Sequence, residues 1–404
     1  MATEPIQGRT CVGLVRLEDG GFTLEYPTHA WDVTYDRSRF LVLDHGRPIA
    51  WLDTALGGRP PTEVLPHRLS KIHVPHTTHH SGDNHVSTQT LAIAICTRNR
   101  ADQLQRCLER LASGPRAADY EILVIDNAPD DNSTKYVVDA FASRGLPVHR
   151  EVEKRPGLSR ARNLALQRTE AQYIAFTDDD TLPDRDWAYR LSCGCTGDDS
   201  VAVVTGLVAP AELETPAQIY FERAVEWSTR LHPETMSMEN RADYDKSFPY
   251  SASHLGAGAN FAIRREVALE LGGFDEALGA GTLSASGEDT EMFVRALRRG
   301  HSLRYEPSAI VWHRHRRSSP ELRRLMFAYG SGVSATSIAE FLNPGKRDMI
   351  KGSLAGARDL ISNRKTDNKL GTPIHLTMIE GAGALVGPAF YLLTRLGNRI
   401  RGLR

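Results

Sequence analysis

The chain has 404 residues, of which 41% are hydrophobic, and its 49 Lys and Arg nearly balance its 50 Asp and Glu. This length allows two or three domains with a large core, and the net charge of −1 gives no reason to expect a nucleic-acid partner. The five cysteines form no disulfide framework, and residues 1–9 lack the apolar core of a signal peptide, so we expect a cytoplasmic location.

Residues 1–66 indicate a small β appendage. Thr10–Val15 has strand character, and Phe40–Leu43 and Ile49–Leu52 flank a turn, as in a hairpin. Residues 67–88 form a polar connector whose histidines lack the spacing of a defined metal site, so we interpret it as a His-rich polar linker. We therefore expect a chain without residues 1–86 to fold. The six histidines of the linker are His67, His73, His76, His79, His80 and His85.

From residue 89 to about residue 330, strands alternate with helices. This alternation predicts an α/β fold with a mostly parallel sheet flanked by helices, and ligands bind such sheets at the carboxyl ends of the strands. The expected strands are Leu91–Cys96, Glu121–Ile125 and Tyr173–Phe176, and the expected helices are 101–112, 135–142, 159–168 and 290–299.

Polar residues follow each of these strands, and the run Asp178-Asp179-Asp180 is the most informative of them. Adjacent carboxylates repel one another unless a cation lies among them. Mg2+ or Mn2+ takes oxygen ligands and commonly joins carboxylates to substrate phosphates. Because alternate residues of an extended strand share a face, Asp178 and Asp180 can reach one ion while Asp179 points elsewhere. A solvated acidic turn with a helix cap is the plainer alternative.

Eight segments of this region occur in the order of a known family. Residues of about 90–330 resemble the family 2 glycosyltransferases, which have the nucleotide-sugar-binding fold called GT-A and transfer sugars with inversion. The matching segments are 96–100 (CTRNR), 124–127 (VIDN), 157–163 (GLSRARN), 176–180 (FTDDD), 258–265 (GANFAIRR), 272–275 (GGFD), 287–289 (GED) and 312–315 (WHRH).

The resemblance implies a nucleotide-sugar site. Asp126 would accept a hydrogen bond from the base, as a carboxylate can from the imide N–H of uracil or thymine. Arg162 would supply a donor fork toward the nucleotide. Asp179 would face the sugar or the ribose. The full set of nucleotide-sugar-binding residues that we expect is Thr97, Arg98, Asp126, Arg162, Asp178 and Asp179.

The resemblance also implies a metal site and a general base. Asp178, Asp180 and His313 would hold Mg2+ or Mn2+, although His315 is an alternative to His313. Asp289 would take the proton of the acceptor hydroxyl, with Glu288 as a second catalytic residue that contacts the acceptor. The same pair could instead only cap the helix that follows it. We expect the acceptor pocket to include residues 250–260, with Asn260 as a contact.

We therefore expect a metal-dependent, inverting glycosyltransferase that uses a UDP- or dTDP-sugar donor. The acceptor could be a glycan, a lipid-linked glycan or a natural product. A phosphatase of the haloacid-dehalogenase type could also use Asp178 and Asp180, but it needs Thr or Val where this chain has Leu182. A nucleotidyltransferase needs a glycine-rich loop after the first strand, and a non-catalytic sugar-binding module needs no separate Glu-Asp pair.

Residues 331–404 form the expected C-terminal helical extension. Residues 381–394 carry no charge and are followed by Arg395, Arg399, Arg401 and Arg404. Such a short apolar segment, interrupted by Pro388, is too short to span a bilayer. It predicts either a helix on the inner face of an anionic membrane or a helix docked on the catalytic domain.

Overall fold

The computed structural model describes residues 8–402, except 19–20, 73–90, 242–243, 245–247, 250–254 and 343–373. Of the six linker histidines, only His67 lies among the described residues. It belongs to helix α1 (Pro61–Leu69), so helical structure continues past residue 66, where the polar linker was expected to begin.

The central sheet has the order β11-β13-β10-β12-β8-β5-β6-β7, with β9 paired to β13. Its β8, β5, β6 and β7 strands are parallel, whereas β12 is antiparallel to both of its neighbours. The fold is α/β with a mostly parallel sheet, as predicted: β5, β6, β7, β8, β10 and β13 run in one direction, and β9, β11 and β12 are antiparallel to the strands that they pair with. Its strands are β5 (Leu91–Thr97), β6 (Ile122–Asn127), β7 (Val148–Glu153), β8 (Tyr173–Asp178), β9 (Thr181–Pro183), β10 (Val201–Pro210), β11 (Glu234–Met236), β12 (Asn260–Arg264) and β13 (Ser302–His313).

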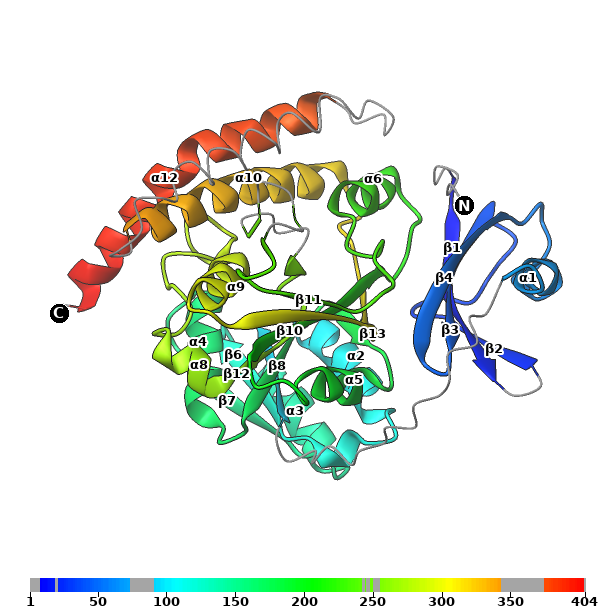
Figure 1. The fold of residues 1–404 in the computed structure, drawn as a ribbon, viewed down its shortest axis with the longest axis horizontal. Helices are drawn as coiled ribbons and strands as arrows, with labels where there is room; N and C mark the ends of the chain where they lie inside the picture. The colour runs from blue at the N-terminus through cyan, green and yellow to red at the C-terminus, as the bar shows by residue number, and fades with distance from the viewer. Residues whose placement is uncertain are drawn as a thin grey trace.

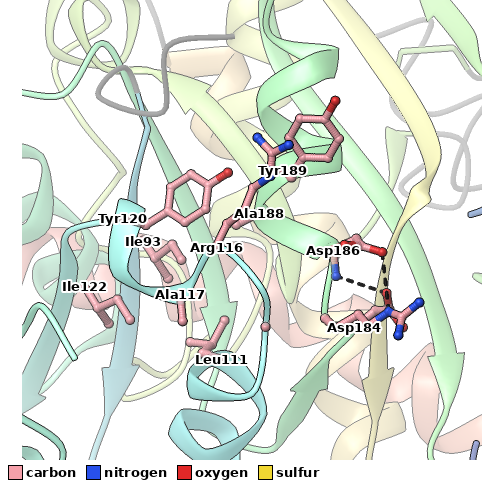
Figure 2. A pocket seen from close by; sticks show the side chains of 12 residues that line it. Ile93, Leu111, Arg116, Ala117, Tyr120, Ile122, Asp184, Asp186, Ala188 and Tyr189 are labelled. Atoms are coloured by element: carbon pink, nitrogen blue, oxygen red, sulfur yellow. Dashed lines mark hydrogen bonds and ion pairs between the residues drawn. The ribbon is translucent and has the colours of Figure 1, made fainter. Parts of the chain in front are cut away.

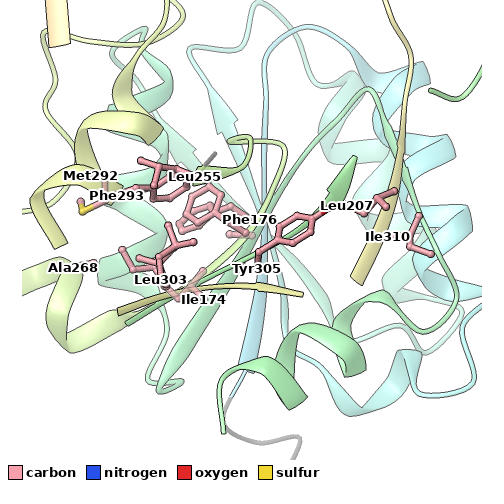
Figure 3. Close-up of a cluster of buried hydrophobic side chains, with 14 of the residues drawn as sticks. Ile174, Phe176, Leu207, Leu255, Ala268, Met292, Phe293, Leu303, Tyr305 and Ile310 are labelled. Atoms are coloured by element: carbon pink, nitrogen blue, oxygen red, sulfur yellow. The ribbon is translucent and has the colours of Figure 1, made fainter. Parts of the chain in front are cut away.

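Helices cover both faces of this sheet (Figure 1). Successive residues of β5 alternate between two apolar clusters: Ile93 and Ile95 face one cluster, and Ala92 and Ala94 face the other. Figure 3 shows part of the second cluster, where the Phe176 and Phe293 side chains lie among aliphatic neighbours. The helices are α2 (Ala101–Ala112), the short 3-10 helix η2 (Ala117–Asp119), α3 (Ser133–Ala142), α4 (Leu158–Arg168), α5 (Trp187–Gly194), α6 (Pro216–Val225), α8 (Arg265–Glu270) and α9 (Glu288–Arg298).

The N-terminal region forms a second sheet with the order β2-β1-β3-β4. The expected hairpin is present as the antiparallel pair β3–β4, and β1 joins β3 in parallel. One face of this sheet packs under α1, and the other contributes Leu14, Leu41 and Leu43 to a core cluster of the central domain. The strands are β1 (Thr10–Glu18), β2 (Gly21–Glu25), β3 (Arg37–Asp44) and β4 (Arg47–Ala55).

Polar contacts join the two sheets as well. Arg16 of β1 forms an ion pair with the buried carboxylate of Asp184 at 2.5 Å, and the Trp51 indole donates to the Ser228 carbonyl at 2.8 Å. The N-terminal sheet is therefore packed on the central domain as part of one structure.

Two long helices form the C-terminal part: α10 (Ser319–Leu342) and α12 (Ile374–Gly402). They pack against each other, with α12 outermost and α10 between α12 and the central domain (Figure 1). Helix α12 continues through Pro388, so the prediction of a short, interrupted apolar segment is wrong. Its residues 374–400 are long and apolar enough to cross a membrane by length and composition.

Candidate active site

The predicted site residues at the strand ends come together at the carboxyl edge of the sheet. Thr97, which ends β5, pairs in register with Asp126 of β6. The Thr97 hydroxyl donates to Asp179 Oδ2 at 2.8 Å, which connects β5 to the acidic run after β8. Arg98 is exposed, and it is Arg100 that reaches the acidic run. Arg100 belongs to the matching segment 96–100, but it is not among the predicted site residues.

The three aspartates have different surroundings. Asp179 and Asp180 are buried, whereas the Asp178 side chain is 33% exposed, so Asp178 is the most open of the three to a ligand. Arg100 Nη1 lies 3.1 Å from Asp179 and 3.7 Å from Asp180, and Arg316 Nη2 lies 3.3 Å from Asp180. Burial and the neighbouring Asp180 raise the pKa of Asp179 to about 6, against the opposing effect of Arg100. The acidic run is thus balanced by two arginines from different elements.

Arg162 lies between two of the predicted site residues. Its guanidinium is buried among the rings of three phenylalanines, donates to Glu288 Oε1 at 2.9 Å and to the Gly258 carbonyl at 3.0 Å, and lies 3.8 Å from Asp178. Each terminal nitrogen thus makes one hydrogen bond to the protein, and the donor fork toward the nucleotide stays a prediction. The rings are Phe176, Phe261 and Phe274.

Glu288 and Asp289 are the first two residues of helix α9, whose N-cap residue is Gly287 and which has no side-chain cap hydrogen bond. The pair therefore lies in the first turn, where its charges complement the helix dipole, rather than at the cap position. Asp289 Oδ1 accepts from the Thr290 amide and Asp289 Oδ2 from the Gly258 amide, both at 2.7 Å. A Cβ at residue 258 would lie 2.5 Å from Asp289 Oδ2, so this approach requires glycine. Burial, followed by repulsion from Asp289, raises the pKa of Glu288 to about 7, although Arg162 opposes the shift.

Arg162 shows that the predicted acid groups share one region, because it lies 3.8 Å from Asp178 of β8 and 2.9 Å from Glu288 of α9. The half-buried phenol of Tyr329 on α10 has a pKa raised first by burial and then by the negative charges of Asp289, Asp178 and Asp180, against the effect of Arg316. The sequence carries no local signal for Tyr329, because it belongs to a separate helix.

The structure distinguishes between the two histidines that follow β13. His313 Nε2 lies 3.6 Å from Asp180 Oδ1, whereas the His315 ring is buried against Phe221 and its Nε2 lies 3.0 Å from Glu222 Oε2. The two Nδ1 atoms are 3.0 Å apart. Burial raises the pKa of Glu222, but the contact with His315, together with its other polar neighbours, outweighs burial, so that the pKa lies below its usual value. When the proton of His315 is on Nε2, that N–H donates to Glu222 Oε2.

This chain of contacts couples the tautomers of the two rings. In the tautomer where His313 Nδ1–H donates to His315 Nδ1, the lone pair of His313 is on Nε2, beside Asp180. Burial, together with His315 and Arg316, lowers the pKa of His313 to about 4 against the opposing effect of Asp180. A neutral imidazole with a free Nε2 is the form that binds a metal ion.

A metal ion fits some of the predicted ligands. Asp180 and His313 supply an oxygen and a neutral nitrogen close together, and Arg100 and Arg316 show that Asp180 attracts cations. Asp178 faces Arg162. Within the described residues, no group of three or more His, Cys, Asp or Glu side chains is placed to hold a metal ion.

Two other predicted residues are buried. Asp126 accepts from Arg150 Nε at 2.8 Å through Oδ2, while its Oδ1 has no hydrogen-bond partner among the described residues. Asn260 is fully buried: its amide nitrogen donates to the Leu207 and Ala309 carbonyls, and its oxygen accepts from the Trp187 indole. Asn260 thus joins three strands and α5 in the interior, and the prediction that it contacts an acceptor is wrong.

A pocket elsewhere in the molecule does not belong to this site. It lies between η2 and the start of α5, and Figure 2 shows Arg116, Tyr120 and Tyr189 along its wall. Ile122 at the amino end of β6 also lines it, whereas Asp126 lies toward the carboxyl end of that strand. The pocket is therefore at the opposite edge of the sheet.

Residues 92–272 match the family described as Glycosyl transferase family 2. Among curated relatives, a pre-mycofactocin glycosyltransferase of Mycobacterium tuberculosis is 29% identical over 247 residues, which cover 60% of this chain and 46% of that protein. Glycosyltransferase AglE of Haloferax volcanii is 27% identical over 247 residues, covering 60% of this chain and 72% of the relative. This chain therefore spans about half the length of the mycobacterial protein.

Solved structures are also similar. A mannosyltransferase of Pyrobaculum calidifontis, solved with GDP-Man and Mn2+, is 16% identical with a TM-score of 0.47, and the match covers 76% of this chain and 86% of that one. The structure of GalNAc-T7 with UDP, GalNAc and Mn2+ is 19% identical with a TM-score of 0.43, covering 65% of this chain and 54% of that one.

Proposed function

We propose that this protein is a metal-dependent, inverting glycosyltransferase that moves a sugar from a nucleoside-diphosphate donor to an acceptor hydroxyl. The observation that carries the proposal is the common position of two acidic groups around Arg162, which lies 3.8 Å from Asp178 of the run after β8 and 2.9 Å from Glu288 of the Glu288–Asp289 pair of α9. A phosphatase or a nucleotidyltransferase would need the first group only. The family 2 domain and the glycosyltransferase relatives support the same activity.

For the donor, we propose that Asp126 reads the base and that Thr97 and Asp179 lie beside the nucleotide. Asp126 Oδ1 is a buried acceptor without a partner among the described residues, and the imide N–H of uracil or thymine would satisfy it. UDP- and dTDP-sugars are thus the proposed donors. Arg100 and Arg316 are the cations closest to the acidic run, so we propose them together with Arg162 as contacts to the diphosphate.

For the metal, we propose Asp180 and His313 as protein ligands of Mg2+ or Mn2+, with Asp178 as a further oxygen donor. Such an ion would neutralise charge on the departing nucleoside diphosphate. With protons on His315 Nε2 and His313 Nδ1, the chain from Glu222 through His315 to His313 would keep the metal-facing nitrogen unprotonated.

For the acceptor, we propose Asp289 as the general base. Each oxygen of its carboxylate accepts one backbone N–H, and a carboxylate oxygen has a second lone pair for the hydroxyl proton. Attack by this hydroxyl from the side opposite the leaving group would invert the anomeric carbon. The ion pair with Arg162 holds Glu288 beside the base as a proposed acceptor contact.

The proposed location is the cytoplasm. All five cysteines are free thiols, which suits a reducing compartment.

The test is nucleotide binding by the whole chain. A thermal-shift screen of UDP, dTDP and GDP with and without Mn2+ would first select the nucleotide, because a ligand of the native state raises its melting temperature. Calorimetry would then compare the wild type with Asp180→Asn, which removes an anionic ligand. We expect the affinity of the mutant in Mn2+ to fall at least about 10-fold.

The matched control is Asp102→Asn, which makes the same change at an exposed position in the first turn of α2. It should leave binding unchanged. Equal affinity of Asp180→Asn and wild type in the presence of Mn2+ would refute the metal assignment.

A further inference from the structure

The outer face of α12 carries a continuous row of exposed apolar side chains. Leu385 is 84% exposed and Met378 is 68% exposed, which is unusual for residues of this type in a folded domain. On an ideal helix, the five positions of this row fall within an arc of about 40°. We call this row the outer stripe; it consists of Ile374, Met378, Leu385, Leu392 and Leu396.

The opposite face of α12 is fully used in holding the helix to the protein. A Cβ at Gly383 would lie 2.1 Å from the Phe327 carbonyl of α10, and one at Gly387 would lie 2.2 Å from the Ser331 carbonyl. Further along, the Tyr391 hydroxyl donates to Asp275 at 2.8 Å and the Asn398 amide donates to the Glu276 carbonyl at 3.1 Å. The outer stripe is therefore not needed for attachment of the helix.

The charge on the second half of α12 has one sign. Glu380 is buried, and no Asp or Glu follows it in the sequence. Arg395 is bound to the Tyr391 hydroxyl, whereas Arg399 is exposed beside the end of the outer stripe. An apolar row that ends in positive charge is complementary to a surface with a hydrocarbon interior and anionic headgroups.

The contacts of α12 fit neither a core helix nor a membrane-spanning helix. A core helix would be mostly buried, but only 28% of the most apolar window is buried. A membrane-spanning helix would have to leave the protein, yet Gly383, Tyr391 and Asn398 attach α12 to α10 and to the central domain along most of its length. Crossing the bilayer would carry the polar side chains of Tyr391 and Asn398 into hydrocarbon, where each unsatisfied polar group costs several kcal/mol.

We propose that α12 lies flat on an anionic membrane, with the outer stripe inserted at the boundary between headgroups and acyl chains. The protein is then attached to one face of the membrane and does not cross it. Because the inserted row runs along the helix, apolar burial supplies the affinity, and the basic C-terminal part selects anionic lipid.

Helix α10 connects this surface to the candidate active site. Thr336 donates to the Gly287 carbonyl at 3.1 Å, and Ser286 donates to the Ala328 carbonyl at 2.8 Å, directly before the Glu288–Asp289 pair. Docking of α12 would therefore place the proposed acceptor side one helix layer from the lipid, which fits a lipid-linked acceptor. This consequence rests on the proposed function, whereas membrane docking does not.

The experiment is co-sedimentation of the full chain with vesicles. Phosphatidylcholine vesicles with and without phosphatidylglycerol are compared at low and high salt. We expect binding to the anionic vesicles, weakened by salt. The double variant Leu385→Glu, Leu392→Glu should bind at least about 10-fold less, because two inserted apolar groups become charged.

The control is Val33→Glu, Leu269→Glu, which places the same two charges at exposed apolar positions outside α12. It should bind vesicles like the wild type. Arg399→Glu should lower binding to anionic vesicles only. Calorimetry with UDP and Mn2+ should give unchanged affinity for both double variants, so a failure of docking remains separate from a failure of the proposed activity.

Two results would overturn the proposal. One is vesicle binding by the α12 double variant equal to that of the control. The other is a wild type that binds no vesicles but sediments as a dimer in analytical ultracentrifugation, while the α12 double variant is monomeric. The outer stripe would then be an interface between two copies of this chain.

Discussion

Removal of the N-terminal sheet tests whether it is an appendage or part of the core. The change is deletion of residues 1–86, for which the sequence predicts a folded remainder. The structure predicts the opposite, because four side chains of the sheet belong to a core cluster of the central domain: Val12, Leu14, Leu41 and Leu43. The deletion would expose the surfaces that these side chains cover.

The magnitude follows from burial. Each of these side chains is at most 5% exposed, and full burial of such a group contributes about 1.5–3 kcal/mol. The four together amount to about 6–12 kcal/mol, an upper value because denatured chains already bury part of this area. A domain has about 5–15 kcal/mol of total stability, so the loss is comparable to all of it.

The assay is the soluble yield of the truncated chain together with its melting curve from calorimetry. We expect insoluble protein or a strongly lowered melting temperature. Leu41→Ala in the full chain should lower the main transition by about 2–5 kcal/mol, whereas the exposed Val33→Ala should not. Soluble truncated protein that melts at the temperature of the wild type would contradict the reasoning.

Two further predictions concern the site. Asp289→Asn should lower turnover of the selected nucleotide sugar by about 100-fold or more while UDP affinity is unchanged. The melting temperature should also fall, because the NH2 group of Asn cannot accept a hydrogen bond and the side chain would lose either the Gly258 or the Thr290 amide as a donor. Turnover equal to that of the wild type would leave only a structural role in the first turn of α9. His315→Ala and Glu222→Gln should each weaken Mn2+ binding in the presence of UDP by about 10–100-fold in calorimetry. Unchanged Mn2+ affinity with a lower melting temperature would show that this chain of contacts has only a structural role.

The sequence predicts the parallel half of the sheet well because each strand and helix there has a clear apolar period. The predicted helix 101–112 and the strand from Leu91 agree with α2 and β5 within a residue at each end. The packing of the N-terminal sheet also has a signal in the sequence: residues 10–15 are apolar or uncharged at both odd and even positions, as in a strand covered on both faces.

The errors arise from contacts between segments far apart in the chain. Asn260 looks like a polar site residue, but it is buried, and its partners come from distant elements. The sequence predicts a shorter helix than α12 because Pro388 and several glycines normally end helices. Here the glycines allow α10 to approach closely, and this packing supports the helix through the proline.

The enclosure of Arg162 by three phenylalanines has a consequence for engineering of the acceptor side. Its guanidinium keeps its charge at any working pH and is the ion-pair partner of Glu288, so the two positions form one design unit. Replacing Glu288 alone to admit a new acceptor would leave the buried Arg162 cation without its nearest carboxylate. Lysine at position 162 would lack the planar fork that reaches Glu288 and the Gly258 carbonyl together. A library intended to change acceptor choice should therefore vary both positions jointly, or keep both and alter the half-buried Tyr329 of α10.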